Sequence, residues 1–510
     1  MIFQHSMPFS IEGSEMSKIK KVLLIVPPAV TFIGARDINP LPPIGMGYLA
    51  AIGEKMGLEV RILDCLIRGW NREEKVSETL VRVGLSDEEI KRHISDFDPD
   101  VVGIGCSFSR QHELYLHVFD LVKRVNPEYI TVAGGAHVTV CTEDILSHPA
   151  CDFVIIGEGE ESFKNLLMSL DLGRSMESID GFGWKNNGKI VINPKTRWIE
   201  DLDSIPLPAY HVMELERYFA LDVSHGVRHE NRFCPIITSR GCPAKCTFCS
   251  AQRVWGNRYR TRSVGSVLEE MKLLKTRYGI KELMFEDDNV TADPNRAKEL
   301  FSAMIREKLN FAWDTPNGVG VWSIDEAMLD LMKASGCVQL NFPVESGSQR
   351  VLREVIRKPL NLSRVRTLIA YCKEIRLDYG MFLVIGMPGE TMAEMWETFL
   401  FAASCGVYNP HISVATPYPG TVLLETCLKN GYLENEFDFE DLFIKSFMIK
   451  TPSWNRGDLE KILLRGRLYL KFREAICDPV NFAFWLAKKM VKPRQLFAHI
   501  RKIVNTGLLT

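Results

Sequence analysis

Short apolar runs rich in β-branched residues alternate with longer amphipathic stretches through the first third of the chain. The runs that predict strands cover residues 21–26, 59–63, 101–105, 129–133 and 152–156. The stretches that predict helices cover residues 45–56, 87–97, 114–125 and 160–169. Continuous apolar strands separated by helices indicate a parallel sheet covered on both faces. We therefore expect a doubly wound, Rossmann-like α/β domain at residues 17–172, with a ligand at the carboxyl ends of its strands.

The alternation resumes over residues 230–430. Predicted strands there cover residues 235–238, 282–286, 338–344, 378–385 and 407–413. This pattern favours a partial (β/α)6 barrel, in which chemistry takes place on the loops that follow the strands. The remaining regions are a loose N-terminal tail (1–16), a linker with a hairpin (173–229) and a helical C-terminal region (431–510). We expect the hairpin to turn at Asn187-Gly188, and the proline-spaced stretch 201–210 is typical of a linker.

The composition is that of a soluble globular protein, with 46% hydrophobic and 25% charged residues among 510. The formal net charge of −2 gives no global signal for nucleic acid. No apolar run is long enough for a membrane-spanning helix, and the N-terminus has no signal-peptide pattern. Most of the 13 cysteines are scattered, which indicates buried thiols in a reducing compartment. We expect a cytoplasmic protein.

The end of the chain differs from the rest. Residues 481–504 contain no acid and carry the basic residues Lys488, Lys489, Lys492, Arg494, Arg501 and Lys502. Apolar residues fall between them at roughly helical spacing, which is compatible with a peripheral membrane contact. We favour the alternative, a helical pair that packs on the barrel and presents a solvated basic face.

Three cysteines stand close together in the segment TSRGCPAKCTFCS. Cys242, Cys246 and Cys249 have the spacing CxxxCxxC, and three thiolates leave one iron of a four-iron cluster without a protein ligand. An open metal position is typical of a reactive site. A zinc knuckle would need a fourth Cys or His at short spacing, and none follows before Cys337. Phe248 lies where its ring would shield the cluster from water.

This motif resembles that of the radical S-adenosylmethionine (radical SAM) enzymes, in which SAM chelates the open iron. The resemblance implies a [4Fe–4S] cluster on the three cysteines and SAM at the strand ends. The acids of LMFEDDN would hold the SAM amine, with Asp287 and Asp288 as candidates, because acids at a strand end need a cationic or donor-rich partner. The alternative is a solvated acidic turn.

Two later strand ends complete the SAM site that the resemblance implies. Glu345 and Ser346 would contact the ribose, and the alternative is a helix cap by Ser346 beside an exposed Glu345. Gly386 and Gly389 in VIGMPGET would allow the backbone to approach adenine or methionine closely.

Basic side chains follow the cysteines, with aromatic residues between them. Arg258 and Arg260 are candidates to bind a phosphate or carboxylate of the substrate, because guanidinium binds such groups bidentately. A salt-bridged surface loop is an equally good interpretation.

The N-terminal domain resembles cobalamin-binding domains. Asp64 and Gly69 match the aspartate and glycine of their DxHxxG motif, but Leu66 stands where the cobalt-ligating histidine would be. We therefore expect cobalamin to bind base-off with no histidine ligand. The GxGxxG fingerprint of dinucleotide binding is absent. Further cobalamin contacts implied by the resemblance are Ser107, Ser109, Gly134, Gly135, Gly157 and Glu158.

On these motifs the chain is identified as a member of the cobalamin-dependent radical SAM family, and it resembles the methyltransferases that act on unactivated carbon. Several segments are similar to those of the phosphonate C-methyltransferases of fosfomycin biosynthesis, among them EDDNVT and CTFCSAQRVWGNRYRTRSV. The resemblance implies that a 5′-deoxyadenosyl radical removes hydrogen from a small substrate, anionic or amphiphilic, which then takes the methyl group of methylcobalamin. It also implies an external electron donor of flavodoxin or ferredoxin type, and demands no protein base.

Two other interpretations stay open. The same scaffold also carries out ring contraction, cyclisation or carbon–carbon coupling without methyl transfer. A non-enzymatic cobalamin sensor belongs to a different class, but it would have no use for the cysteine triad.

Overall fold

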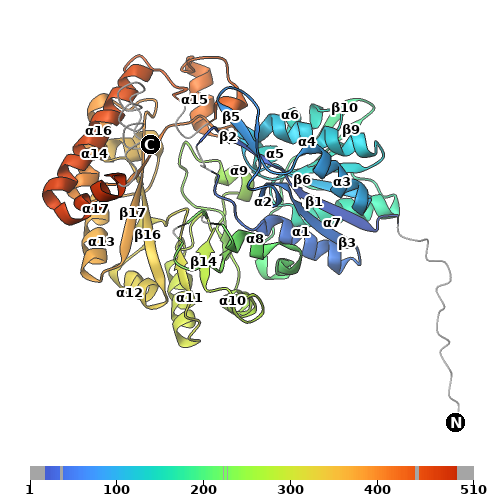
Figure 1. The fold of residues 1–510 in the computed structure, drawn as a ribbon, viewed down its shortest axis with the longest axis horizontal. Helices are drawn as coiled ribbons and strands as arrows, with labels where there is room; N and C mark the ends of the chain where they lie inside the picture. Colours follow the sequence, from blue (N-terminus) through green and yellow to red (C-terminus); the bar gives the residue numbers. More distant parts are fainter. Residues whose placement is uncertain (1–17, 35–37, 222, 227, 443–446, 491–510) are drawn as a thin grey trace, which may run out of the picture.

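The computed structural model describes residues 18–34, 38–221, 223–226, 228–442 and 447–490. Two parallel sheets lie side by side with helices around each, the first from the N-terminal third of the chain and the second from its middle (Figure 1). The expected N-terminal tail and residues 491–510 of the basic C-terminal segment lie outside the described residues. The predicted α/β architecture is confirmed.

The first sheet has the strand order β3-β1-β6-β7-β8, all parallel, and the hairpin β9-β10 extends its edge. The order reverses at β1, so the carboxyl ends of β1 and β6 flank the crevice in which such sheets bind ligands. The strands are β1 (Lys21–Val26), β3 (Glu59–Asp64), β6 (Val101–Gly105), β7 (Ile130–Gly134), β8 (Phe153–Ile155), β9 (Phe182–Asn186) and β10 (Lys189–Asn193).

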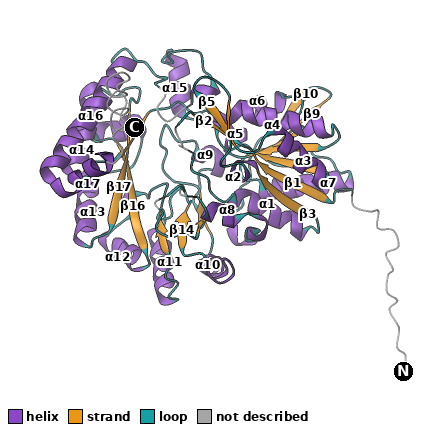
Figure 2. Ribbon diagram, in the orientation of Figure 1, coloured by secondary structure: helices purple, strands orange, loops and turns teal. Residues whose placement is uncertain are grey.

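Helices cover both faces of this sheet (Figure 2). α1 (Ile44–Lys55) and α7 (Glu160–Leu172) pack together on one face, and α3 (Asp87–Phe97) and α4 (His112–Val125) pack together on the other. Alternate residues of β1 belong to one hydrophobic core, and the residues between them belong to the second. A strand buried on both faces needs apolar residues throughout, which explains the continuous apolar runs.

The domain also contains a hairpin turn, a small antiparallel sheet and three short helices. The β9–β10 turn is confirmed at Asn187 (φ 48°) and Gly188 (φ 77°), since both have the positive φ that a two-residue turn of type I′ requires. An unexpected antiparallel sheet joins β2 (Ala29–Phe32), β5 (Leu80–Val83) and β4 (Glu73–Lys75). Short helices are α2 (Cys65–Arg68), α5 (Ala136–Val140) and α6 (Thr142–Ser147).

The second sheet is the predicted partial barrel, with six parallel strands in chain order. The strands are β11 (Phe233–Ile236), β14 (Glu282–Phe285), β15 (Ala312–Asp314), β16 (Cys337–Glu345), β17 (Asp378–Ile385) and β18 (His411–Val414). The sequence pattern did not reveal β15, which has only three residues. A separate pair, β12 (Ser239–Arg240) and β13 (Arg260–Thr261), flanks the cysteine loop.

Helices alternate with the barrel strands. Those with side-chain N-caps begin sharply; for example, the Asp293 carboxylate accepts from the backbone N–H groups of Asn295 and Arg296 at the start of α11. The helices are α9 (Ala251–Trp255), α10 (Val264–Tyr278), α11 (Pro294–Arg306), α12 (Glu326–Ala334), a π-helical turn (Val351–Ile356), α13 (Leu362–Glu374), α14 (Met392–Ser404) and α15 (Val422–Asn430).

The segment between the sheets is packed. Leu202 and Ala209 are buried, and the hydroxyl of buried Tyr210 donates to Glu270 of α10. α8 (Leu215–Phe219) follows, and one continuous hydrophobic core includes residues of both sheets and of this segment. The proline-spaced stretch is thus part of the core that the two units share.

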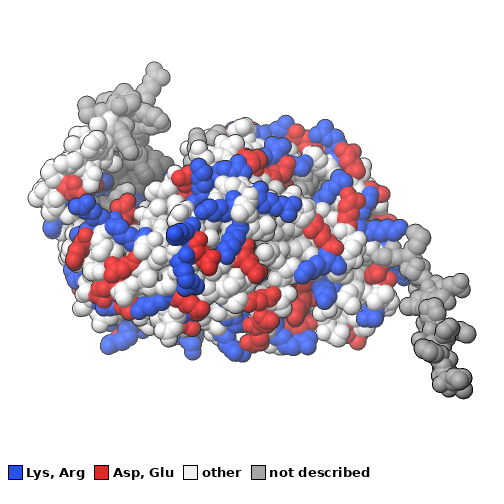
Figure 3. Space-filling model, turned by 90° about the horizontal axis from the view of Figure 1, so that it is seen from below, with Lys and Arg blue, Asp and Glu red and all other residues white. Residues whose placement is uncertain are grey.

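The C-terminal region contains α16 (Arg456–Cys477) and α17 (Pro479–Met490). α16 packs on α14, where a Cβ atom on Gly466 would meet the ring of Phe399 at 2.2 Å. The favoured interpretation of a packed helical pair concerns residues 481–504, of which the structure describes only 481–490, in α17, so it stays a prediction. No helix within the described ranges is long and apolar enough to cross a membrane. Acidic and basic side chains are interspersed over the face in Figure 3.

Candidate functional site

The three cysteines lie on the loop between β12 and α9, at the carboxyl end of the barrel. All three are free; Cys249 is exposed and the other two are half-buried. The backbone N–H of Thr247 donates to Ile356 O at 2.9 Å and fixes the middle of the loop. Burial raises the pKa of the Cys246 thiol to about 12, so cluster binding must displace a proton there.

These thiols suit a cubane cluster. They lie on one short loop, and each ligand of a cubane binds a different iron. Phe248, which directly precedes Cys249, is half-buried, and its role in shielding the cluster from water stays a prediction. Gly241 (φ 85°) begins the loop where a Cβ atom would meet Arg258 O at 2.4 Å, so the tight turn needs glycine.

The two acids after β14 have different surroundings. Asp287 is buried and accepts from the Thr238 backbone N–H (3.1 Å), the Thr238 hydroxyl (2.8 Å) and the Ser239 hydroxyl. Among the described residues, Asp288 accepts from the Gly241 backbone N–H alone, at 3.2 Å, and burial raises its pKa to about 6. Asp288 is therefore the carboxylate beside the cluster loop that remains available to a ligand, whereas Asp287 stabilises the protein.

Glu345 ends β16 in a strained left-handed conformation (φ 67°). Its carboxylate accepts from Lys358 Nζ at 2.7 Å, and both side chains are buried. Ser346 is engaged within the protein, since its hydroxyl accepts from the Ser348 backbone N–H at 3.1 Å. Sequence reasoning missed Lys358, because a single lysine 13 residues after Glu345 carries no recognisable signal.

The VIGMPGET loop follows β17. Gly386 (φ 84°) and Gly389 (φ 93°) both need the freedom of glycine. Glu390 holds the loop closed, because its Oε2 accepts from the backbone N–H groups of Gly386 (2.9 Å) and Met387 (3.1 Å). Burial raises the pKa of Glu390 to about 8. Its position within the motif could have identified Glu390 from the sequence.

A polar cluster at the barrel rim was not foreseen. His225, from the segment before β11, places Nδ1 3.0 Å from Oε1 of Glu286, and Asn317 donates to Oε2 of Glu286 at 3.1 Å. The hydrogen bond to Glu286 raises the pKa of His225. Glu286 immediately follows β14, so this cluster lies at the same rim as Asp288.

The arginines expected to bind a substrate anion are already paired. Arg258 is exposed and donates to Glu200 at 2.7 Å, as in the alternative interpretation of a salt-bridged loop. Arg260 is buried and donates to both carboxylate oxygens of Glu158, at 2.8 and 2.9 Å. Glu158 thus occupies the guanidinium of Arg260, which was expected to contact substrate.

At the end of β3, Asp64 is buried and caps α2 by accepting from the Ile67 backbone N–H at 2.9 Å. Its second oxygen accepts from the hydroxyl of Tyr218 in α8. Leu66 is half-buried beside it. Gly69 ends α2 where a Cβ atom would meet the Gly84 backbone at 2.0 Å. In the DxHxxG-like loop, Asp64 and Gly69 thus have structural roles within the loop, and Tyr218 donates a hydrogen bond to the aspartate.

The next two loops lie at the carboxyl ends of β6 and β7. Ser107 is exposed, whereas Ser109 is buried and lies 2.9 Å from Nδ1 of His137. Nε2 of His137 lies 2.9 Å from Nδ1 of His112, a buried pair that sequence reasoning missed. Burial lowers the pKa of His137 to about 3, so this pair is neutral.

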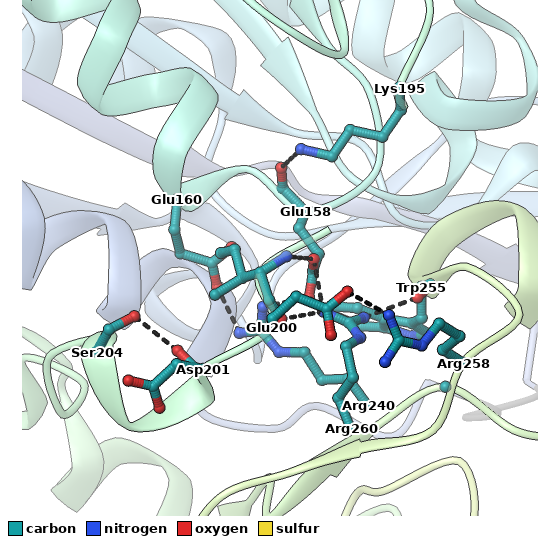
Figure 4. Close-up of polar contacts among 12 residues, drawn as sticks. Glu158, Glu160, Lys195, Glu200, Asp201, Ser204, Arg240, Trp255, Arg258 and Arg260 are labelled. Atoms are coloured by element: carbon teal, nitrogen blue, oxygen red, sulfur yellow. Dashed lines mark hydrogen bonds and ion pairs between the residues drawn. The ribbon is translucent and has the colours of Figure 1, made fainter. Parts of the chain in front are cut away.

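The glycines of the second loop differ. A Cβ atom on Gly134 would meet nothing within 4 Å, whereas one on Gly135 (φ 118°) would meet Cys106 O at 2.6 Å. The open space at Gly134 fits the expected nucleotide tail of cobalamin. Gly157 (φ 71°) lies against the ring of Trp198. Glu158 is buried between Arg240 and Arg260 (Figure 4). Glu158 is therefore engaged with the barrel.

Comparison with known proteins supports both domain assignments. A B12 binding domain model matches residues 31–167, and a Radical SAM superfamily model matches residues 236–402. Cytidylyl-2-hydroxyethylphosphonate methyltransferase of Streptomyces wedmorensis is 35% identical over 488 residues, which cover 89% of this chain and 91% of the relative. The anaerobic magnesium-protoporphyrin IX monomethyl ester cyclase of Rubrivivax gelatinosus is 26% identical and covers 93% of this chain and 80% of the relative.

A solved structure shares the fold. The radical SAM methyltransferase TsrM of Kitasatospora setae, with tryptophan substrate and a SAM analog bound, matches with a TM-score of 0.67 and 17% identity, covering 88% of this chain and 89% of that chain. A flavodoxin-like sheet joined to an open barrel with a three-cysteine loop defines a cobalamin-binding radical SAM enzyme. The chain belongs to the cobalamin-dependent radical SAM methyltransferase family, with a [4Fe–4S] cluster, SAM and cobalamin as cofactors.

Proposed function

We propose that this enzyme transfers a methyl group to an unactivated carbon of a small metabolite. The 35% identity to a methyltransferase carries the choice of reaction, and the structural observation that agrees with it is the meeting of the two strand-end regions at Glu158. The loop after β8 of the first sheet contacts Arg240, which directly precedes the cysteine loop of the barrel. This arrangement brings the expected cobalamin loops and the cluster loop to one interface.

In this reaction the cluster and SAM supply a hydrogen-abstracting radical and cobalamin supplies the methyl group. The protein's part is to bind and orient. Asp288 would accept from the SAM amine, and the buried Lys358–Glu345 pair would meet its polar groups. The open space at Gly134 would admit the nucleotide tail, and Leu66, which stands at the histidine position of the motif, supports cobalamin binding without a histidine ligand from this loop.

The name of one relative bears on the chemical class of the substrate. The S. wedmorensis relative acts on a cytidylyl phosphonate by its name, which favours an anionic substrate here. Arg258, Arg260 and His225 are each paired with a glutamate, so a substrate anion at the barrel rim would have to displace Glu286 from His225 in order to bind there. We infer a small polar anion that reaches the barrel rim.

A second function has specific support, since a cyclase covers 93% of this chain. Anaerobic incubation of the reconstituted enzyme with methyl-deuterated SAM and host extract distinguishes the two. A methyltransferase forms 5′-deoxyadenosine and S-adenosylhomocysteine in comparable amounts and places the label in a product. Formation of 5′-deoxyadenosine without S-adenosylhomocysteine, together with a product that lacks the label, would favour cyclisation.

We infer that an acidic electron carrier of flavodoxin or ferredoxin type reduces the cluster in a reducing, cytoplasmic setting. The thirteen free cysteines support the setting, and the exposed basic residues Lys245, Arg253 and Arg258 around the cluster loop support the carrier. The rate of cluster reduction by reduced flavodoxin should fall as ionic strength rises. A rate independent of salt would count against this partner.

A peripheral membrane contact rests on exposed apolar side chains. α16 and α17 expose Leu468, Phe472, Ile476, Val480 and Phe484, each by more than half of its surface, and the basic segment follows them in sequence. We infer that this face binds anionic bilayers. The enzyme should co-sediment with vesicles containing phosphatidylglycerol, and Phe472→Ser should weaken this. Equal binding to neutral vesicles, or none, would contradict the inference.

A further inference from the structure

Glu158 is the centre of a buried charged network between the two sheets (Figure 4). Its Oε1 accepts from NH1 of Arg240 at 2.9 Å and from NH1 of Arg260 at 2.8 Å, and its Oε2 accepts from the Ile199 backbone N–H at 3.0 Å. Side-chain exposure is 0% for Glu158 and 3% for each arginine. Glu160 pairs with the second nitrogen of Arg240, so two acids balance two bases.

The network is continuous with the cobalamin loop on one side. Gly157, next to Glu158, donates its backbone N–H to the Thr139 hydroxyl at 2.8 Å. That hydroxyl donates in turn to Gly135 O at 3.0 Å, within the Gly-Gly loop. Two hydrogen bonds and one peptide unit therefore join Glu158 to the loop that we expect to contain the nucleotide tail.

On its other side the network adjoins the cysteine loop. Arg240 is separated from Cys242 by Gly241 alone, and Gly241 donates to Asp288, the carboxylate available for SAM. Arg260 donates to Trp255 O at 2.7 Å, at the end of the helix that follows the cysteine loop. Both arginines thus hold the two ends of the cluster segment on one carboxylate.

Aromatic side chains enclose these charges. Arg240 lies over the ring of Trp255 at 5.0 Å, and Arg260 lies over the ring of Trp198 at 5.8 Å. Trp198 also fills the space between Gly157 and Gly256, where added Cβ atoms would lie 3.2 Å and 2.8 Å from its ring. Such enclosure excludes water and gives the network one geometry, because an unpaired buried charge is costly.

We propose that Glu158 is a positioning residue that fixes the cobalamin loop against the cluster loop and so sets the separation of the two cofactors. The cofactors must face each other across a substrate, and preorganised contacts of this kind supply such alignment. The proposal goes beyond methyl transfer itself, since any radical reaction on this scaffold needs the same spacing.

The test is the dipolar coupling between cob(II)alamin and the reduced cluster, measured by pulsed electron paramagnetic resonance in the holoenzyme. Wild type should show one defined coupling. Glu158→Gln should shift or lose it, because a neutral amide cannot satisfy both arginines, and Glu158→Asp should partly restore it. Glu200→Gln, which removes the exposed partner of Arg258, is the matched control and should leave the coupling unchanged.

A folded Glu158→Gln holoenzyme with unchanged coupling would overturn the proposal. If that variant fails to fold, Arg260→Lys replaces it, since lysine keeps the charge but loses the fork that reaches Glu158 and Trp255 together. A shifted coupling in Arg260→Lys supports the positioning role. A folded Arg260→Lys holoenzyme with the wild-type coupling rejects that role.

Discussion

At the scale of single residues, the structure separates side chains that the sequence leaves equivalent. Asp287 and Asp288 are adjacent carboxylates, yet Thr238 and Ser239 bind the first, and one backbone N–H binds the second. The pattern EDDN predicts the strand end that carries them. It cannot predict which carboxylate turns toward the neighbouring strand, because that depends on the hydroxyl groups that lie opposite.

Asp288→Asn should weaken SAM binding about 10- to 100-fold, because the hydrogen bond lost is to a charged group. The apo protein should keep its stability. Asp287→Asn should do the reverse, lowering the free energy of unfolding by about 1–3 kcal/mol as buried hydroxyl donors lose a partner. Equilibrium SAM titration and denaturant unfolding measure the two effects, and equal effects of both variants on SAM would contradict the assignment.

Leu66→His alone should not create a cobalt ligand. The ligating histidine needs a carboxylate to orient its ring, and Tyr218 already occupies Asp64. Electron paramagnetic resonance of the cobalt(II) state should therefore lack axial nitrogen splitting in Leu66→His. The splitting should appear when Leu66→His is combined with Tyr218→Phe, because the Asp64 carboxylate is then free to orient the histidine ring. Nitrogen splitting in wild type would mean that another side chain lies below cobalt.

Asp64 should also give the apo protein a pH-dependent stability. Burial raises its pKa from 3.8 to about 6, so the folded state binds the proton more tightly than the unfolded state does. Stability from this group therefore falls as pH rises from about 4 to 6 and stays low above. Wild type should gain about 1 kcal/mol over Asp64→Asn between pH 7.5 and pH 5. Denaturant unfolding of both proteins would reveal a constant difference if this is wrong.

At the scale of elements, the sequence predicts well where local pattern and burial agree. The strands of the first sheet and the turn at Asn187-Gly188 are apolar runs and turn residues with their own signals. β15 and β2 are missed because three or four residues hold too little pattern, and their pairing depends on strands elsewhere in the chain. The loops at strand ends are located correctly, but their contacts depend on tertiary packing.

The glycine loops of the first sheet offer a matched pair of substitutions. Gly69→Ala should destabilise the apo protein by about 1–3 kcal/mol, because its Cβ atom would overlap the Gly84 backbone. Gly134→Ala should leave apo stability within about 0.5 kcal/mol. It should nevertheless weaken cobalamin binding at least about tenfold, since the methyl group enters the space expected for the nucleotide tail. Unchanged cobalamin affinity in Gly134→Ala would place the tail elsewhere.

At the scale of the whole molecule, the two sheets share one hydrophobic core. The segment at 201–210, which the sequence presents as a linker, is packed at Leu202, Ala209 and Tyr210. Proline spacing indicates an irregular backbone but not whether that backbone is buried. The packing partner, α10, lies more than 50 residues further along, so local sequence could not reveal it.

Thermal unfolding of the apo enzyme should therefore show one cooperative transition that includes both sheets, with calorimetric and van't Hoff enthalpies equal. Tyr210→Phe removes the hydroxyl that donates to Glu270 and should lower the transition temperature of the whole protein without splitting it. Two resolved transitions, one for each sheet, would show that the shared core does not couple them.

The hydrogen bond between Tyr218 and Asp64 also bears on how this enzyme can change over evolutionary time. A lineage that had lost the cobalt-binding histidine could not regain its use by one codon change at Leu66, since the aspartate is already committed to Tyr218. Two substitutions in separate segments would have to coexist before either is favoured. Reversal would therefore need two coincident substitutions, so descendants are expected to diversify around the substrate and to retain a residue other than histidine at position 66.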